Sequence, residues 1–270
     1  MGQGLGLALH RAGHEVVLVS RTRHPVVAPL RLHAGDRGDA VRPAELLLLA
    51  TPDDAVPVVA RELAAEGAVH AGQIVLHLSG LLDRQALSAL APTGAGLGSF
   101  HPLQSVADPE TAPDRLRGSY VGIEGDERAL AAARRLGSAL GLVPVELAAG
   151  SKAAYHAGAV VAANYLVVLS SVAGRMAQEA GIDPALAERI YLPLMQGVAA
   201  NLERGSVAAL TGPVRRGDVR TIQAHLASLG PDDRALYKCL GRAALDLAIR
   251  AGLPPDAAAA VGEVLDEPPV

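Results

Sequence analysis

Lys152 and His156 are the side chains whose types and spacing most directly suggest chemistry. They stand four positions apart in residues 150–164, a stretch that begins polar and becomes rich in alanine and valine. On a helix such residues lie on one side, so an ammonium and an imidazole would project into the same space. There they could donate protons to a bound carbonyl group. Taken alone, the pair is better explained as a solvated lysine and a hydrogen-bonded core histidine, so the surrounding elements must decide.

Length and composition predict a globular protein of two domains. The chain has 270 residues, more than a single domain usually holds, and 50% of them are hydrophobic. Its formal net charge is −4, its aromatic content is 2%, and it has no tryptophan. No basic tract interleaved with aromatic residues is present, which argues against a nucleic-acid-binding surface.

The compartment follows from cysteine usage and from the apolar segments. Cys239 is the single cysteine, so no disulfide can form within the chain, and we expect a reducing, cytoplasmic location. No signal-peptide pattern is found at the N-terminus. Residues 157–174 are uncharged and about as long as a bilayer-spanning helix. Because they contain an asparagine and two serines, and no second such segment exists, we expect no membrane span. We predict instead a helix buried in a helical core, of a length that also suits sharing across a homodimer.

The first half alternates between helical and buried-strand patterns, which predicts an α/β nucleotide-binding domain over residues 1–149. A helix at 2–13 followed by a strand is the second part of a mononucleotide-binding unit, and Gly2 matches the third glycine of the dinucleotide fingerprint. The strand and glycine-rich turn that should precede it are not in this sequence. We therefore expect a Rossmann-like parallel sheet lacking its first strand, either from a start assigned inside the gene or from truncation, and weakened cofactor binding. The expected strands are 14–20, 30–34, 45–50, 73–78, 94–100, 120–124 and 143–147.

The ends of two strands indicate the cofactor. The strand 14–20 leads into Ser20, Arg21, Thr22 and Arg23. Arginines with small hydroxyl residues at this position accept a 2′-phosphate, which favours NADP over NAD. The alternative is an ordinary basic loop. The strand 45–50 leads into Thr51 and Pro52, which would lie along the nicotinamide half, and Asp53 is a suitable N-cap for the helix that follows.

Further strand ends supply candidate substrate-binding residues. Ligands bind at the carboxyl edge of an open α/β sheet. Ser79 closes the strand 73–78, and His101 and Gln104 follow the strand 94–100. We predict that these three side chains bind substrate.

The second half, residues 150–270, reads as about six helices separated by glycine and proline breaks. It is the predicted substrate and dimerisation domain. The turn at 210–218 gathers a hydroxyl, two arginines and a carboxylate. Either Asp218 simply caps the next helix, or the turn is a lid in which Arg215 or Arg216 contacts an anionic substrate.

Together these motifs resemble a bacterial family of Rossmann-like NADP-binding proteins with a helical C-terminal domain of unknown function. That family is related to ketopantoate reductase, pyrroline-5-carboxylate reductase and 3-hydroxyisobutyrate dehydrogenase. The wider superfamily places a catalytic lysine at the start of the first helix after the nucleotide domain, which implies that role for Lys152. His156 occupies the place where asparagine is common, so this sequence departs from the pattern there. The matching segments are 50–55, 78–80, 100–104, 152–157, Asn164 and 209–218.

The resulting hypothesis is a reductase that transfers hydride from NADPH to a carbonyl or imine carbon of a small acidic metabolite, with a 2-oxo acid such as ketopantoate as the first candidate. Lys152 would donate the proton, with His156 as orienting group or alternative acid. Ser79, His101 and Asn164 would position substrate, and Arg216 would pair with its carboxylate. A second hypothesis is a non-catalytic NADP-binding or sensing protein. A metalloenzyme is a third, weaker one, because His77, His101, His156 and His225 lack the spacing of metal ligands.

Overall fold

The structure of the chain is a computed structural model that describes residues 1–33 and 35–267. Ala34, the last residue of one predicted strand, and residues 268–270 of the predicted second domain lie outside the described residues. The chain forms two compact units, Met1–Tyr165 and Leu166–Val270. The boundary predicted at residue 150 lies just ahead of helix α6 (Lys152–Glu179), which begins in the first unit and continues into the second.

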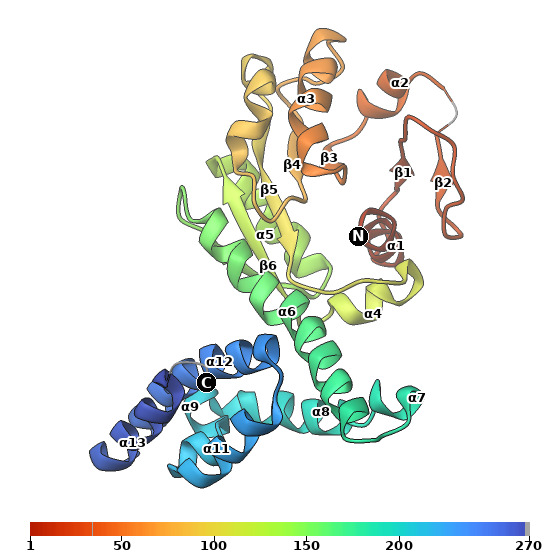
Figure 1. Ribbon diagram of the computed structural model, residues 1–270. Helices are drawn as coiled ribbons and strands as arrows, with labels where there is room; N and C mark the ends of the chain where they lie inside the picture. Colours follow the sequence, from red (N-terminus) through yellow and green to blue (C-terminus); the bar gives the residue numbers. More distant parts are fainter. Residues whose placement is uncertain (34, 268–270) are drawn as a thin grey trace. The chain divides into compact units, whose positions relative to one another are not determined.

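The first unit is built on a five-stranded, mostly parallel sheet (Figure 1). Strands β3, β4 and β5 are parallel to one another, but β6 is antiparallel to β5 and β7 is parallel to β6, so the predicted parallel sheet is not wholly parallel. The strands, in sheet order, are β3 (Leu46–Leu49), β4 (Ile74–His77), β5 (Gly96–Pro102), β6 (Tyr120–Gly125) and β7 (Val143–Glu146).

Helices cover both faces of this sheet and bury two separate cores. One face carries Phe100, Val121 and Ile123 beneath helices on that side, and the other carries Leu47, Leu49 and Val75. Strand side chains alternate between faces, so both cores arise from the same strands. The first face is covered by α1 (Gly2–Arg11), α4 (Ala112–Leu116) and α5 (Glu127–Ala139); the second by α3 (Val56–Ala65) and the 3₁₀ helix η2 (Arg84–Thr93). Three short elements complete the unit: α2 (Arg37–Val41), η1 (Asp53–Ala55) and η3 (Pro109–Thr111).

The predicted position of the absent strand coincides with a break in the sheet. Strands β1 (Val17–Leu18) and β2 (Arg31–Leu32) pair only with each other and form a separate parallel ribbon. In the described chain, β1 and β3 are therefore both edge strands, and Val17 is 50% exposed. Helix α1 packs on both sheets, because its Leu5 belongs to the main core while Gly6 approaches Leu18. The ordinary doubly wound order places one parallel strand between two such edges.

Helix α6 contains an apolar run, across the boundary between the two units, that the chain itself does not cover. Residues 161–168 are all exposed, on every side of the helix, and Val167 reaches 70% exposure. The prediction that this segment is buried in the chain's own helical core is therefore wrong for this run. By length and composition α6 could also cross a membrane, and only 6% of its most apolar window is buried.

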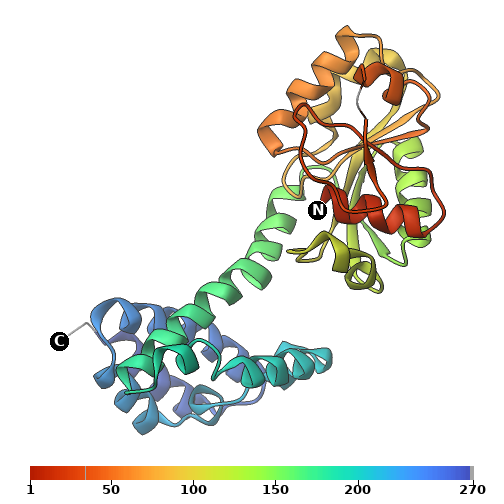
Figure 2. The same cartoon turned by 90° about the vertical axis from the view of Figure 1, so that its right-hand side faces the viewer.

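The second unit is entirely helical among its described residues (Figure 2). Its core is formed by apolar side chains that include Ile222, Ala248, Val261 and Leu265. Asp218 accepts hydrogen bonds from the Thr221 backbone and hydroxyl and so caps the helix that follows, as one of the two predicted readings has it. The elements are the rest of α6, α7 (Pro184–Ala187), α8 (Leu192–Asn201), η4 (Leu202–Arg204), α9 (Ser206–Ala209), α10 (Pro213–Arg216), α11 (Val219–Ser228), α12 (Pro231–Arg250) and α13 (Pro255–Asp266).

Candidate active site

Lys152 is buried at the point where α6 meets the sheet. Its side chain is only 2% exposed. The ammonium donates a 2.7 Å hydrogen bond to the Ser79 carbonyl and a 3.0 Å bond to the Ser99 hydroxyl. The Ser79 hydroxyl accepts from the backbone N–H groups of Leu81 and Leu82, which fixes the turn after β4 and aims that carbonyl at the lysine. An ammonium has three donors, so these two bonds leave one for a further partner.

A row of polar side chains lies beneath the lysine. The strand registers pair His77 with Ser99 and Ser99 with Glu124, so the three stand side by side across β4, β5 and β6. Residues directly opposite one another on neighbouring strands point to the same face. The outer two hold the turn before η2: His77 Nε2 donates to the Asp83 carbonyl at 3.0 Å, and Glu124 accepts from the Arg84 N–H at 2.8 Å. This otherwise apolar sheet therefore carries a polar row, which crosses the end of β4, the middle of β5 and the last residues of β6.

His101, Tyr155 and His156 form the second part of the site. Tyr155 lies over Gly122 of β6, and its hydroxyl hydrogen-bonds His101 Nδ1 at 3.0 Å. The His101 and His156 rings meet edge to face with centroids 5.7 Å apart, and both lie against Gly80. A side chain at Gly80 would overlap the His156 ring. The two glycines thus allow the first turns of α6 to approach the sheet closely enough to bring these rings together.

Burial tunes the charge states of these groups. It lowers the pKa of Lys152 to about 8, although Glu124, Asp53 and Asp83 favour the ammonium. It also lowers the pKa of His101 to about 4, helped by repulsion from Lys152, so His101 is a neutral imidazole at neutral pH. The pKa of Tyr155 rises to about 12 by burial, which keeps its hydroxyl protonated. The site therefore presents one proton donor, Lys152, whose pKa is close to neutral pH, and two uncharged hydrogen-bonding groups, His101 and Tyr155.

The start of α1 has the features of a phosphate-binding helix end. The helix begins at Gly2 without any side-chain cap and without an acidic residue in its first turn, so backbone N–H groups remain for an anion. A side chain at Gly2 would come within 2.7 Å of the Ala50 Cβ, where β3 ends. Gln3 binds the Pro25 carbonyl and the Val27 N–H, which ties the basic loop after β1 to this helix end.

The predicted cofactor residues are all accessible around this helix end. Gly2 begins the helix and is half-buried, and Arg21 lies in the basic loop that Gln3 anchors. The exposed residues of the two predicted cofactor loops are Ser20, Arg21, Thr22 and Arg23 after β1, and Thr51 and Pro52 after β3. Asp53, expected to cap a helix, instead begins η1 and makes no capping side-chain bond.

The structure does not bring every predicted substrate residue to Lys152. Ser79 and His101 lie in the site, but the Gln104 amide is committed to the Arg115 carbonyl and the Ser119 hydroxyl. Asn164 is exposed twelve residues further along α6, about 18 Å from Lys152 along the helix axis. Arg216 lies in the last turn of α10, in the second compact unit.

Sequence reasoning missed three residues of this site. Ser99 and Glu124 lie inside apolar strands, and Tyr155 stands in the matching segment 152–157 without a role of its own. A signal for the first two exists in the sequence, because a serine and a glutamate interrupt otherwise apolar or glycine-rich strand segments. Their pairing depends on the antiparallel register of β5 and β6, which the sequence pattern did not reveal.

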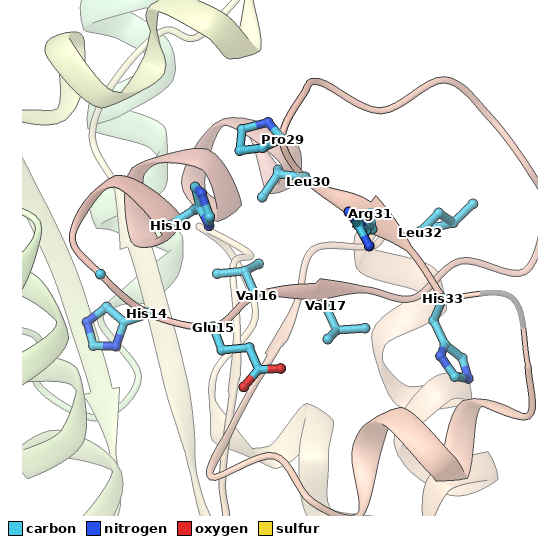
Figure 3. Close-up of a pocket in the computed structure, with 11 residues that line it drawn as sticks. His10, His14, Glu15, Val16, Val17, Pro29, Leu30, Arg31, Leu32 and His33 are labelled. Atoms are coloured by element: carbon cyan, nitrogen blue, oxygen red, sulfur yellow. The ribbon is translucent and has the colours of Figure 1, made fainter.

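Two surface hollows lie away from these residues. One is formed between the end of α1 and the β1–β2 ribbon, where Figure 3 shows His10, Val16 and Leu30 among its lining side chains. The other is lined by Arg204, Arg215 and neighbouring residues of the second unit. The first contains no predicted site residue, and the second contains Arg215, one of the two arginines of the predicted lid. No group of three His, Cys, Asp or Glu residues in the described part of the chain is arranged to hold a metal ion.

The fold and site define a Rossmann-like α/β protein with a helical C-terminal domain and a buried lysine at the join. Residues 1–102 match the model of the Rossmann-like domain, and residues 119–244 match that of DUF2520, a domain of unknown function. The chain therefore combines a Rossmann-like domain with a DUF2520 domain, which confirms the resemblance found in the sequence. No curated protein matches the chain.

Solved structures share this architecture. Protein TM1727 from Thermotoga maritima is 26% identical, with a TM-score of 0.64 over 77% of this chain and 79% of that one. Protein BF3122 from Bacteroides fragilis, which carries an NADP oxidoreductase assignment, is 20% identical, with a TM-score of 0.69 over 90% and 93%. The pyrroline carboxylate reductase of Plasmodium falciparum, solved with NADP bound, is 9% identical, with a TM-score of 0.61 over 98% and 95%. At these identities the last two show a common fold.

Proposed function

We propose that this protein is an NADP-dependent oxidoreductase that reduces a carbonyl or imine carbon of a small acidic metabolite. The observation that carries the proposal is the buried Lys152 ammonium, which bonds the Ser79 carbonyl at the carboxyl end of β4 and the Ser99 hydroxyl of β5. His101 and His156 lie close by. Ligands of open α/β sheets bind outside this edge. A cation held there stabilises negative charge that develops on a substrate oxygen.

In this proposal Lys152 is the proton donor. As the substrate carbon is reduced, its oxygen takes a proton from Nζ, and the neutral amine that remains recovers a proton from solvent. A pKa of about 8 suits this exchange, because the donor is charged at neutral pH and yet gives up its proton readily. His101 and His156 hydrogen-bond and orient the substrate, and His156 is the alternative acid.

The residues at the start of α1 fit a dinucleotide. The uncapped helix end would hold the pyrophosphate, and Arg21 and Arg23, with Ser20 and Thr22, would accept the 2′-phosphate that distinguishes NADP from NAD. Bound there, the reduced cofactor supplies the hydride. Thr51 would lie along its nicotinamide half, after β3.

For the substrate we propose a 2-oxo acid, with a ketopantoate-like compound tested first. The acidic character follows from the cationic lysine and from Arg216, which would pair with a carboxylate if the helical domain, from the same chain or from a partner, contributes to the site. Asn164 would add a hydrogen bond in the same way. Gln104, whose amide serves its own loop, is the weakest of the proposed substrate residues.

We further propose a cytoplasmic homodimer formed through the helical domain. The support is the exposed apolar surface on that unit, which includes Val167 and, at 65% exposure, Leu194 of α8. A helix that is apolar on all sides is ordinarily buried, and here nothing in the described chain buries residues 161–168. A second copy supplies such a cover, and a lone exposed cysteine fits a reducing compartment.

The proposal is tested in two steps. The first titrates NADPH and NADH by nicotinamide fluorescence into this chain and into a version with a designed strand and a Gly-x-Gly turn fused ahead of Met1, to fill the gap between β1 and β3. We expect NADPH to bind the fused version preferentially, and a substrate screen with 2-oxo acids and cyclic imines then follows. The absence of binding to both versions would contradict the cofactor assignment.

The second candidate is a non-catalytic NADP-binding or sensing protein. One observation favours it: Lys152 is buried and already donates two hydrogen bonds within the protein, as a lysine with a structural role does. Cofactor binding without turnover on any carbonyl or imine compound supports this reading, and turnover excludes it.

A further inference from the structure

The groups around Lys152 include a buried carboxyl that the proposed reaction does not use. Glu124 is 8% exposed, and its only hydrogen bond among the described residues is to the Arg84 backbone N–H. A fully buried carboxylate is costly unless it meets positive charge or hydrogen bonds. Its neighbour across the strands is Ser99, whose hydroxyl accepts from the Lys152 ammonium. Glu124 therefore lies one side chain away from a buried cation.

We propose that Glu124, together with Ser99, is a positioning residue that keeps Lys152 in its charged form and aims its ammonium at the substrate side of the sheet. The role deepens the proposed reductase function and rests on it for its catalytic meaning. Glu124 does not touch substrate in this proposal. It supplies the negative charge that offsets burial of the lysine, and Ser99 supplies the oxygen that fixes the direction of Nζ.

The arrangement of the polar row supports this assignment. Ser99 stands between His77 and Glu124, and His77 is uncharged because burial lowers its pKa to about 4. His77 Nε2 donates to the Asp83 carbonyl, so its ring cannot act as an anion toward the lysine. In this row, therefore, Glu124 is the member that can carry a negative charge.

Other ionisable groups also face Lys152 and must be separated from Glu124 in any test. Asp53 at the start of η1 and Asp83 before η2 favour the ammonium, but less than Glu124 does. His101 and His156 add no negative charge. The groups from each element near the lysine are His77 of β4, Asp83 of the following turn, His101 of β5, Glu124 of β6, Asp53 of η1, and Tyr155 and His156 of α6.

The sequence allows the charge state of Lys152 to be measured directly. The chain has only two lysines, Lys152 and Lys238, so protein labelled with ¹³C and ¹⁵N in lysine gives two side-chain signals, and Lys238→Arg assigns them. The chemical shift of the ε-carbon against pH then reports the pKa of each lysine. This readout requires no turnover, so it distinguishes failure of the Glu124 assignment from failure of the reductase proposal.

The decisive variant is Glu124→Gln, which keeps an acceptor for the Arg84 N–H and removes the charge. We expect the pKa of Lys152 to fall by about one unit, because a neighbouring opposite charge shifts a pKa by roughly one to three units. Ser99→Ala should also lower it, because the ammonium loses an acceptor. Glu127→Gln, an exposed change on α5, is the matched control and should leave both lysine signals unchanged.

An unchanged Lys152 pKa in Glu124→Gln overturns the proposal. If that variant does not fold, Glu124→Asp retracts the charge by one methylene and should lower the pKa by a smaller amount, and no change there overturns it equally. Where turnover is found, the alkaline limb of the kcat/KM profile should move down with the lysine pKa in Glu124→Gln, while KM for NADPH stays the same. A purely structural role would lower activity without moving that limb.

Discussion

The ammonium of Lys152 donates a 3.0 Å hydrogen bond to the hydroxyl of Ser99, although 53 residues separate the two in the chain. The bond joins the first residue of α6 to the middle of the sheet. The same ammonium bonds the Ser79 carbonyl, which follows the carboxyl end of β4. Ser99 in turn lies next to the buried carboxyl of Glu124 in the strand register. This one contact ties the helix that leads into the second unit to the chemistry proposed for the first.

Replacing Lys152 by alanine should lower turnover by roughly two to four orders of magnitude, the range that a positioned general acid supplies. Affinity for NADPH should be nearly unchanged, because the predicted cofactor residues lie at α1 and at the ends of β1 and β3. The measurement is steady-state kinetics beside a fluorescence titration of the cofactor. Lys238→Arg, on α12, is the control. An unaltered kcat in Lys152→Ala would remove the lysine from the mechanism.

The rate of reduction should fall as pH rises through about 8. The lysine must be protonated to donate, and burial lowers its pKa to about 8, so the ammonium is present below that value and lost above it. The reverse oxidation needs the neutral amine and should rise through the same range. Profiles of kcat/KM in both directions check the sign. A reductive rate that does not decline up to pH 10 would argue for a different donor.

Gly80→Ala should damage the site although Gly80 itself carries no catalytic group. Its new methyl would overlap the His156 ring and crowd His101, so the α6 helix or both rings must shift. We expect destabilisation of about 1–3 kcal/mol and a fall in turnover larger than the fall in cofactor affinity. Urea unfolding and kinetics measure the two effects. Gly230→Ala, where a methyl meets no atom within 4 Å, is the matched control and should change neither by much.

The sequence was sufficient for the alternating α/β domain and for the helical domain that follows it, because buried strands and helix starts leave local patterns. Glu124 and Ser99 required the register of β5 against β6, a long-range antiparallel pairing that local sequence patterns do not reveal. The exposure of residues 161–168 could not be predicted from the sequence either. An apolar pattern predicts a buried helix, but it does not show whether the residues that bury the helix belong to the same chain or to another molecule.

The proposal that a second copy of the chain covers residues 161–168 is tested by measuring the oligomeric state. Val167 is 70% exposed on α6, and an aspartate there would place a charge in the proposed interface between two copies. We expect the wild-type chain to have the mass of a dimer by light scattering without detergent, and Val167→Asp to shift it toward the monomer while circular dichroism shows that its helices remain. Val58→Asp, an exposed change on α3 of the other unit, should leave the dimer intact. A wild-type monomer in dilute buffer would contradict the dimer. A chain that stays in solution only with detergent would instead identify lipid as the cover and would equally contradict the dimer.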